Sequence, residues 1–189
     1  MNLLYEVYDR ANIVKTGKYY TTINELTDQI PALRPSVLIE AATKMYSKCN
    51  CEKYTKILCE EDKGIILGTV ISLMTGLPLA VAREYNYSIP DGTKVDYVCE
   101  YMSGELYING VDKNDKVLIV DDTISTGGTL SALIMGVINI GATVEDIVVC
   151  VEKKNNKGVD RIKREFNINV QSCMIIDVQD GKVKVCRED

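Results

Sequence analysis

The chain has 189 residues, of which 46% are apolar, and it carries a formal net charge of −5. This length predicts one domain, residues 1–189, with enough apolar residues for a buried core. The negative charge argues against a nucleic-acid partner, and no apolar run approaches the roughly 20 residues that span a bilayer. The N-terminus turns polar too early for a secretion signal, so we expect a cytoplasmic protein with no membrane partner. Because the chain lacks histidine, an acid or base catalyst must be a carboxylate, a tyrosine, a lysine or the substrate.

The chain has seven cysteines, an odd number at scattered spacing and without a CxxC pair. This pattern is typical of free thiols in a reducing compartment. Cys49 and Cys51 could contact a metal ion, but two ligands without a histidine are weak evidence for such a site. The sequence assigns no role to this pair.

The N-terminal third predicts a short helix at 3–11 and two short strands that flank a turn at 15–18. The second of these strands covers 19–23. Pro35 suits the first position of a following helix. In that helix one face carries apolar residues at helical spacing, namely Leu38, Ala41, Ala42 and Met45.

From residue 54 onward, apolar strands alternate with helices. The strands are predicted at 54–58, 78–82, 117–120, 144–151 and 170–176, and the helices at 64–75, 130–138 and 159–166. Such alternation predicts an α/β fold with a mainly parallel central sheet flanked by helices.

One stretch breaks this alternation. Residues 83–96 are polar and read either as a mobile loop over a site or as a solvated surface loop. Residues 95–101 and 105–108 then predict an antiparallel pair, which would carry the loop as a small hood.

The most informative segment is 117–129, in which four apolar residues lead into Asp121 and Asp122. A turn rich in glycine and hydroxyl groups follows, and then a helix begins. Open parallel sheets bind ligands at the carboxyl ends of their strands, and helix N-termini bind anions. Two carboxylates beside such a turn fit a vicinal diol and a phosphate, which together describe a ribose 5-phosphate. A capped helix alone would not need two acids, and the glycine patterns of P-loops and Rossmann folds are absent.

Residues 117–129 resemble the 5-phosphoribosyl 1-pyrophosphate (PRPP) signature of the type I phosphoribosyltransferases. The resemblance covers most of the chain. It extends to Asp62-Lys63-Gly64 at the start of a helix, to Arg83 at a strand end, and to the run from Gly104 to Gly110. The chain is most similar to the archaeal hypoxanthine/guanine phosphoribosyltransferase-like group within this family.

The resemblance implies that a purine base and PRPP react to give a nucleoside 5′-monophosphate and pyrophosphate. It implies that Asp121 and Asp122 hold the ribose, directly or through Mg²⁺ as cofactor, and act in catalysis. It further implies two sets of binding residues. The ribose and 5-phosphate would be bound by Asp121, Asp122, Thr123, Ser125, Thr126, Gly127, Gly128 and Thr129. The pyrophosphate would be bound by Asp62, Lys63, Gly64 and Arg83.

The chain departs from the family pattern at two places. Ser125 stands where mammalian-type hypoxanthine/guanine enzymes carry an aspartate near the base. Glu100 is then the candidate for the proton chemistry, with Tyr101 beside the base, unless Glu100 is a solvated strand residue. The loop segment 84–88 also lacks the usual basic residues, which puts tight clamping of pyrophosphate in doubt.

Lys153 follows a core strand, where oxopurine enzymes of the family place a lysine that donates to the 6-oxo group of the base. The alternative is that Lys153 and Lys154 lie in a solvated loop. Hypoxanthine or guanine is therefore favoured, and adenine stays open. An enzyme for another base, such as orotate or uracil, and a non-catalytic PRPP-binding regulator are further alternatives. Since members of the family usually dimerise, we expect a homodimer.

Overall fold

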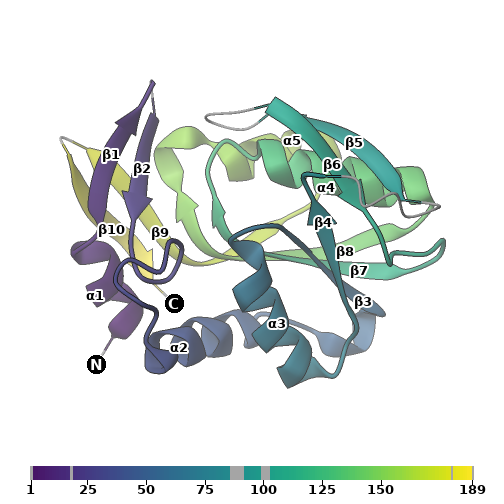
Figure 1. Ribbon diagram of the computed structural model, residues 1–189, viewed down its shortest axis with the longest axis horizontal. Helices are drawn as coiled ribbons and strands as arrows, with labels where there is room; N and C mark the ends of the chain where they lie inside the picture. The colour runs from purple at the N-terminus through teal and green to yellow at the C-terminus, as the bar shows by residue number, and fades with distance from the viewer. Residues whose placement is uncertain (1, 18, 86–91, 99–102, 180, 189) are drawn as a thin grey trace.

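The computed structural model describes residues 2–17, 19–85, 92–98, 103–179 and 181–188 (Figure 1). Its centre is an eight-stranded sheet in the order β10-β9-β8-β7-β3-β4-β6-β5. The strands of this sheet are β3 (Lys56–Glu60), β4 (Leu79–Arg83), β5 (Thr93–Val98), β6 (Ser103–Ile108), β7 (Lys116–Ile124), β8 (Thr143–Lys153), β9 (Val170–Gln179) and β10 (Lys182–Glu188).

The middle of the sheet is parallel and its two margins are antiparallel. Strands β4, β3, β7, β8 and β9 run in one direction, whereas β10 pairs antiparallel with β9, and β6 with β4 and β5. The mainly parallel α/β sheet is therefore confirmed. The sequence reasoning missed β10, whose alternating residues suit an edge strand with one exposed face.

Helices cover both faces of the sheet (Figure 1). They are α1 (Leu3–Asp9), α2 (Pro35–Tyr46), α3 (Gly64–Thr75), α4 (Gly128–Ile140) and α5 (Gly158–Phe166), with short 3-10 turns η1 (Cys51–Lys53) and η2 (Lys154–Asn156). Side chains alternate along β7. Leu118 and Val120 pack in the core beneath α1, α2 and α3, while Val117 and Ile119 pack beneath α4 and α5. Burial on both faces explains the continuous apolar run in this strand.

A second, two-stranded sheet stands apart from the first. It consists of β1 (Asn12–Thr16) and β2 (Tyr19–Ile23), which pair antiparallel. The antiparallel pair predicted near 95–108 is present, but β5 and β6 extend the main sheet instead of standing apart from it. The β1–β2 hairpin contacts the carboxyl end of β8, where Nζ of Lys153 donates to the backbone oxygen of Tyr20.

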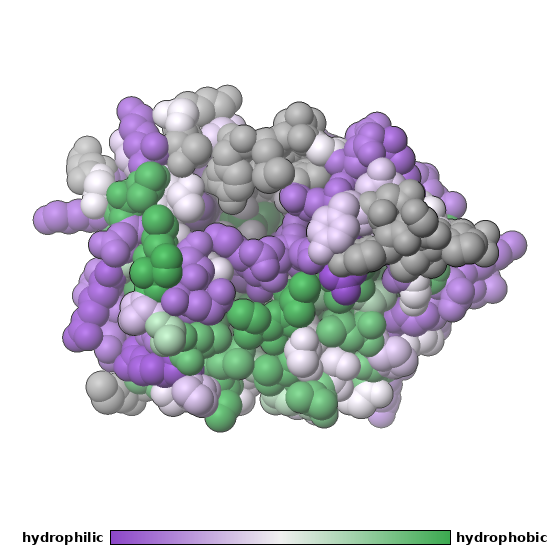
Figure 2. Space-filling model, viewed as in Figure 1, coloured by the Kyte–Doolittle hydropathy of each residue, from purple (hydrophilic) through white to green (hydrophobic). Residues whose placement is uncertain are grey.

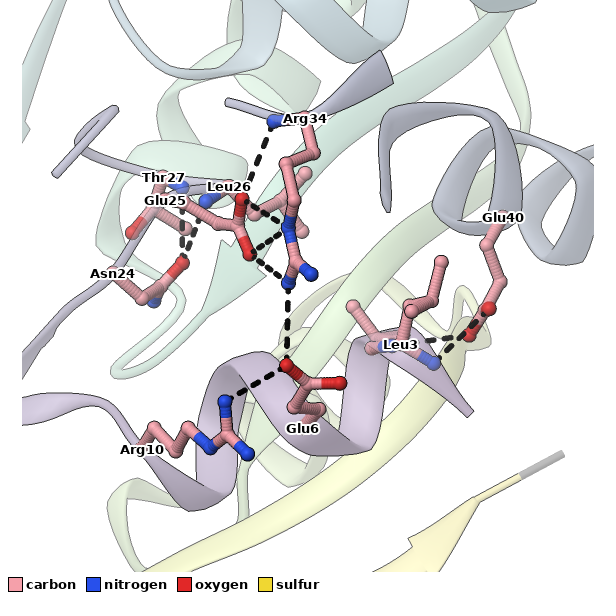
Figure 3. A network of polar contacts seen from close by, with 10 residues as sticks. Leu3, Glu6, Arg10, Asn24, Glu25, Leu26, Thr27, Arg34 and Glu40 are labelled. Carbon is pink, nitrogen blue, oxygen red and sulfur yellow. Dashed lines mark hydrogen bonds and ion pairs between the residues drawn. The ribbon is translucent and has the colours of Figure 1, made fainter. Parts of the chain in front are cut away.

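A polar network anchors the N-terminal segment (Figure 3). Glu25, which is buried, accepts a 2.5 Å hydrogen bond from Nη2 of Arg34, and Glu6 lies 3.6 Å from the same nitrogen. Glu40 on α2 accepts hydrogen bonds from the backbone N–H groups of Leu3 and Leu4, which are unsatisfied donors of the first turn of α1. These bonds fix α1 and the segment after β2 against α2.

Two predicted boundaries need correction. The strand predicted to end at residue 120 continues to Ile124, because β8 pairs with it as far as Ile124 and Glu152. Strands also occupy both ends of the predicted loop 83–96, since β4 includes Arg83 and β5 begins at Thr93. Residues 86–91 of that loop lie outside the described part of the chain. Among the described residues, no helix has the length and apolar character needed to cross a membrane.

Candidate functional site

An open pocket lies at the carboxyl ends of β3, β7 and β8. Parallel strands deliver their following residues to one edge of the sheet, which is where open α/β folds bind ligands. The residues that line the pocket are Thr21, Thr22, Thr27, Glu60, Lys63, Asp121, Asp122, Thr123, Ser125, Thr129 and Lys153. We call it the carboxylate pocket. Seven of these residues belong to the predicted site, so the fold brings together residues far apart in sequence.

Asp121 and Asp122 are held by bonds within their own strand. The backbone N–H of Asp122 donates to Oδ1 of Asp121 at 2.8 Å, and Oγ1 of Thr123 donates to Oδ2 of Asp122 at 3.0 Å. Both aspartates are buried, at 5% and 7% exposure. Burial of two adjacent carboxylates costs free energy, which argues that this pair serves a ligand.

The electrostatics of the pocket reflect mutual repulsion among carboxylates. Burial, and then the charges of Asp122 and Glu60, raise the pKa of Asp121 well above its ordinary value. Burial, and then the charge of Asp122, raise the pKa of Glu60 to about 8. The pKa values are raised because burial disfavours the ionised carboxylates and because these repel one another. A ligand that brings positive charge or hydroxyl donors relieves this repulsion, so the pocket favours such a ligand.

Glu60→Gln is expected to stabilise the ligand-free protein increasingly as pH rises. Between pH 4.5 and about 8 the folded chain keeps a proton on Glu60 that the unfolded chain releases. The wild-type free energy of unfolding therefore falls through this window. Glutamine does not ionise, so the free energy of unfolding of the variant should not fall in this way. We expect the variant to be more stable than the wild type by on the order of 2 kcal/mol at pH 9. Urea denaturation at pH 5, 7 and 9 measures the difference.

Glu52→Gln is the matched control, because Glu52 is an exposed carboxylate on η1. It should leave the pH dependence of unfolding unchanged. A Glu60→Gln gain that is equal at pH 5 and pH 9 would contradict the assigned cause.

The turn after β7 contributes to the wall of the pocket. Ser125 and Thr129 line the pocket, and α4 begins at Gly128, so its first N–H groups are free of intrahelical partners. Gly127 has φ +77°, a left-handed conformation that glycine adopts without strain. Thr126, Gly127 and Gly128 belong to this turn, although their side chains or Cα atoms do not line the pocket.

The segment after β3 lies against the aspartates. Lys63 lines the pocket, and its Nζ lies 2.7 Å from Oδ1 of Asp28. Burial alone would raise the pKa of Asp28, but hydrogen bonds from Lys63 and Thr27 outweigh it and hold that pKa below its ordinary value. A Cβ added to Gly64 would lie 3.3 Å from Oδ1 of Asp121, so this glycine permits the close approach.

Two further residues were predicted to bind pyrophosphate. Asp62 and Arg83 are not among the residues that line the carboxylate pocket, and Nη1 of Arg83 donates to Oε1 of Glu61 at 3.3 Å. Glu100 and Tyr101, predicted for proton chemistry and base binding, fall outside the described residues.

Lys153 stands at the last position of β8 and is only 7% exposed. Its Nζ donates to the backbone oxygen of Tyr20 at 3.2 Å, so the solvated-loop interpretation is wrong for this lysine. Lys153 also lines a second pocket, which we call the tyrosine pocket. The other lining residues of this pocket are Tyr19, Tyr20, Asn155, Asn156, Ile176 and Val178.

Sequence reasoning missed four lining residues of the carboxylate pocket. Thr21, Thr22 and Thr27 come from β2 and the segment after it, and no local pattern predicts that this hairpin covers the pocket. Glu60 did carry a signal, because it follows the buried run Ile57-Leu58-Cys59 as Asp121 follows its own apolar run.

Comparisons with known proteins agree with this geometry. The family model described as a phosphoribosyl transferase domain matches residues 32–181. A hypoxanthine/guanine phosphoribosyltransferase of Methanothermococcus okinawensis is 40% identical over 185 residues, which cover 98% of this chain and 100% of the relative. A protein of the same name from Methanothermus fervidus is 34% identical over 181 residues, covering 96% and 95% of the two chains.

Solved structures support the fold. The crystal structure of an adenine phosphoribosyltransferase from Rhodothermus marinus matches with a TM-score of 0.75 at 21% identity and covers 93% of this chain and 98% of its own. At that identity the likeness concerns the fold alone. The family model and the full-length archaeal relatives carry the assignment, and the chain belongs to the phosphoribosyl transferase domain family.

Proposed function

We propose that the protein is a purine salvage enzyme that converts hypoxanthine or guanine and PRPP to the nucleoside 5′-monophosphate and pyrophosphate. The observation that carries this proposal is the carboxylate pocket, whose wall combines two buried aspartates, hydroxyl groups of the turn after β7 and the buried Lys153. The archaeal relatives that match over nearly their whole length are named hypoxanthine/guanine phosphoribosyltransferases.

In this reaction a ring nitrogen of the base attacks the anomeric carbon of ribose as pyrophosphate leaves. Asp121 and Asp122 bind the ribose hydroxyls, and their negative charge stabilises the oxocarbenium-like transition state. Ser125, Thr129 and the N–H groups at the start of α4 bind the 5-phosphate. Fixing both ends of the sugar holds the anomeric carbon in line for attack.

Two lysines bind the remaining parts of the substrates, which are the pyrophosphate and the base. Lys63, oriented by Asp28, offsets the charge of the leaving pyrophosphate, together with the backbone around Gly64. Lys153 donates to the 6-oxo group of the base, which lies in the tyrosine pocket. An ammonium group favours an oxo acceptor over the amino group of adenine, so this contact selects hypoxanthine and guanine.

Mg²⁺ is the proposed cofactor. The donor set suits it, because Asp121, Asp122 and Glu60 offer hard carboxylate oxygens whose mutual repulsion a cation would relieve. Among the residues that the structure describes, no three His, Cys, Asp or Glu side chains could hold a metal by themselves. Asp121 and Asp122 would therefore share Mg²⁺ with oxygens of PRPP or hold it through water, as is common for this ion. The bound ion would neutralise charge on the leaving pyrophosphate.

The test of the proposed reaction is product stoichiometry. Purified protein with PRPP, Mg²⁺ and hypoxanthine should form inosine 5′-monophosphate and pyrophosphate in equal amounts, and no pyrophosphate without the base. A protein that binds PRPP but releases no pyrophosphate with any purine would instead be a regulator.

The partner of the chain is proposed to be a second copy of itself. Helix α3 is apolar on its outer side too, with Leu73 80% exposed, and the adjacent α2 adds the exposed Ile39. Figure 2 shows apolar side chains gathered where Figure 1 draws α3. Residues 64–82 contain no charged side chain, so two copies can meet there without repulsion despite the net charge of −5.

Leu73→Asp is expected to dissociate this homodimer, because two carboxylates would be buried at a two-fold contact. Light scattering after gel filtration should give twice the 21.0 kDa of one chain for wild type and a single chain for the variant. Ile138→Asp, which alters an exposed apolar residue of α4, is the control and should stay dimeric. A monomeric wild type, or dissociation by the control alone, would contradict the proposed surface.

We place this activity in the cytoplasm and assign it to one domain of residues 1–189. Six cysteines of the described chain are free thiols, which suits a reducing compartment. Strands from Lys56 to Glu188 form one sheet, which supports a single structural unit.

A further inference from the structure

The segment 153–158 links the two pockets. It runs from Lys153 at the end of β8 through η2 to Gly158 at the start of α5. Lys153 lines both pockets, whereas Asn155 and Asn156 line the tyrosine pocket. One short piece of chain therefore lies along the pocket assigned to the base and beside the turn assigned to the 5-phosphate.

Asn156 makes a direct bond to that turn. Its Nδ2 donates a short hydrogen bond to Oγ of Ser125, which lines the carboxylate pocket. A hydroxyl group that accepts from an amide keeps its own hydrogen to donate. Ser125 can then present an O–H to an anion in the pocket.

The backbone of the segment is fixed against the same turn. A Cβ added to Gly158 would lie 2.2 Å from the carbonyl oxygen of Ser125 and 2.9 Å from the backbone nitrogen of Gly127. Only glycine permits this approach without a shift of the turn. The neighbouring Asn155 bonds elsewhere, because its Nδ2 donates to Oδ1 of Asp177 on β9.

We propose that Asn156 is a positioning residue for the 5-phosphate, which acts from the tyrosine pocket by holding the Ser125 hydroxyl so that its hydrogen points at the phosphate. The inference rests on the proposed function, in which residues 125–129 bind that phosphate. It adds a residue outside the PRPP motif to the machinery that binds PRPP, and it connects the wall of the base pocket to phosphate affinity.

The test is a double-mutant cycle on Asn156→Ala and Ser125→Ala, with ribose 5-phosphate as the calorimetric probe. Asn156→Ala should weaken binding of ribose 5-phosphate and raise KM for PRPP, each about tenfold. The double variant should match Ser125→Ala alone, because Asn156 acts through that hydroxyl. Asn155→Ala is the matched control and should bind the probe as wild type does.

Asn156→Asp separates positioning from folding. An aspartate cannot donate a hydrogen bond to Ser125. It would instead accept one from the serine hydroxyl, so that the hydroxyl hydrogen no longer points at the phosphate. Its loss of probe affinity should therefore exceed that of Asn156→Ala, at unchanged thermal stability. Wild-type protein that fails to bind ribose 5-phosphate would refute the phosphate assignment itself. Wild-type binding with unaltered affinity in both Asn156 variants, or an additive cycle, would overturn this inference alone.

Discussion

Asp121→Asn combined with Asp122→Asn is expected to lower kcat/KM about a thousandfold or more while raising the melting temperature. The loss follows because neutral amides cannot stabilise a developing cation or bind Mg²⁺ as carboxylates do. The gain follows because burial and neighbouring acids disfavour the ionised form of Asp121. In the wild type the backbone N–H of Asp122 donates to Oδ1 of Asp121. An asparagine at position 121 keeps a side-chain oxygen that can accept this bond.

The size of the stability effect depends on pH. Because the pKa of Asp121 is raised in the folded state, its contribution to the free energy of unfolding is lowest once pH exceeds that pKa. Relief by asparagine should therefore grow as pH rises. For a chain of this size each kcal/mol corresponds to about 2–4 °C in melting temperature. Calorimetric melts at pH 6 and pH 9, together with steady-state rates, measure both effects.

Asp146→Asn is the control for this pair. Asp146 lies at the amino-terminal end of β8, away from the pocket, and accepts a 2.6 Å hydrogen bond from the hydroxyl of Tyr54. Activity should survive in this variant, and stability should not rise. Wild-type rates in the Asp121/Asp122 double variant would mean that the aspartates do not bind the ribose.

Lys153→Met is expected to lower kcat/KM for hypoxanthine and guanine by about a hundredfold and to affect adenine far less. Methionine retains the apolar stem but removes the ammonium donor, and a charged hydrogen bond contributes about 1.5–3 kcal/mol. Steady-state rates with each base at saturating PRPP give the comparison.

Lys154→Met is the matched control, since Lys154 is the neighbouring lysine and is exposed. It should change no rate by more than about twofold. Nζ of Lys153 also bonds the backbone oxygen of Tyr20, so the lysine helps to hold β2 over the pocket. An equal loss for every base would point to that structural role and contradict the contact with the 6-oxo group.

The parts of the fold with strong local patterns were predictable. The run 117–120 has the apolar character of a strand buried on both faces, and Gly141 marks the end of α4 with φ +87°. Asp121 and Asp122 could be identified because a buried strand leads directly into them. The same logic would have found Glu60, but the strand was predicted at 54–58 and in fact occupies Lys56–Glu60.

The missing parts of the site depend on contacts between distant segments. Thr21 and Thr22 line the pocket only because β2 lies across the ends of β7 and β8, about a hundred positions later in the chain. The bond from Asn156 to Ser125 is of the same kind, because the two residues are 31 positions apart in the chain. Such packing is decided by the tertiary fold and leaves no signal in local periodicity.

The proposed specificity is tested most directly by a panel of purine bases. Hypoxanthine, guanine, xanthine and adenine would each be supplied with PRPP and Mg²⁺, and nucleotide and pyrophosphate would be followed together. We expect kcat/KM for hypoxanthine and guanine to exceed that for adenine by at least about tenfold, with one pyrophosphate per nucleotide. A preference for adenine would contradict the role of Lys153, and no turnover with any of the four bases would contradict the enzyme itself.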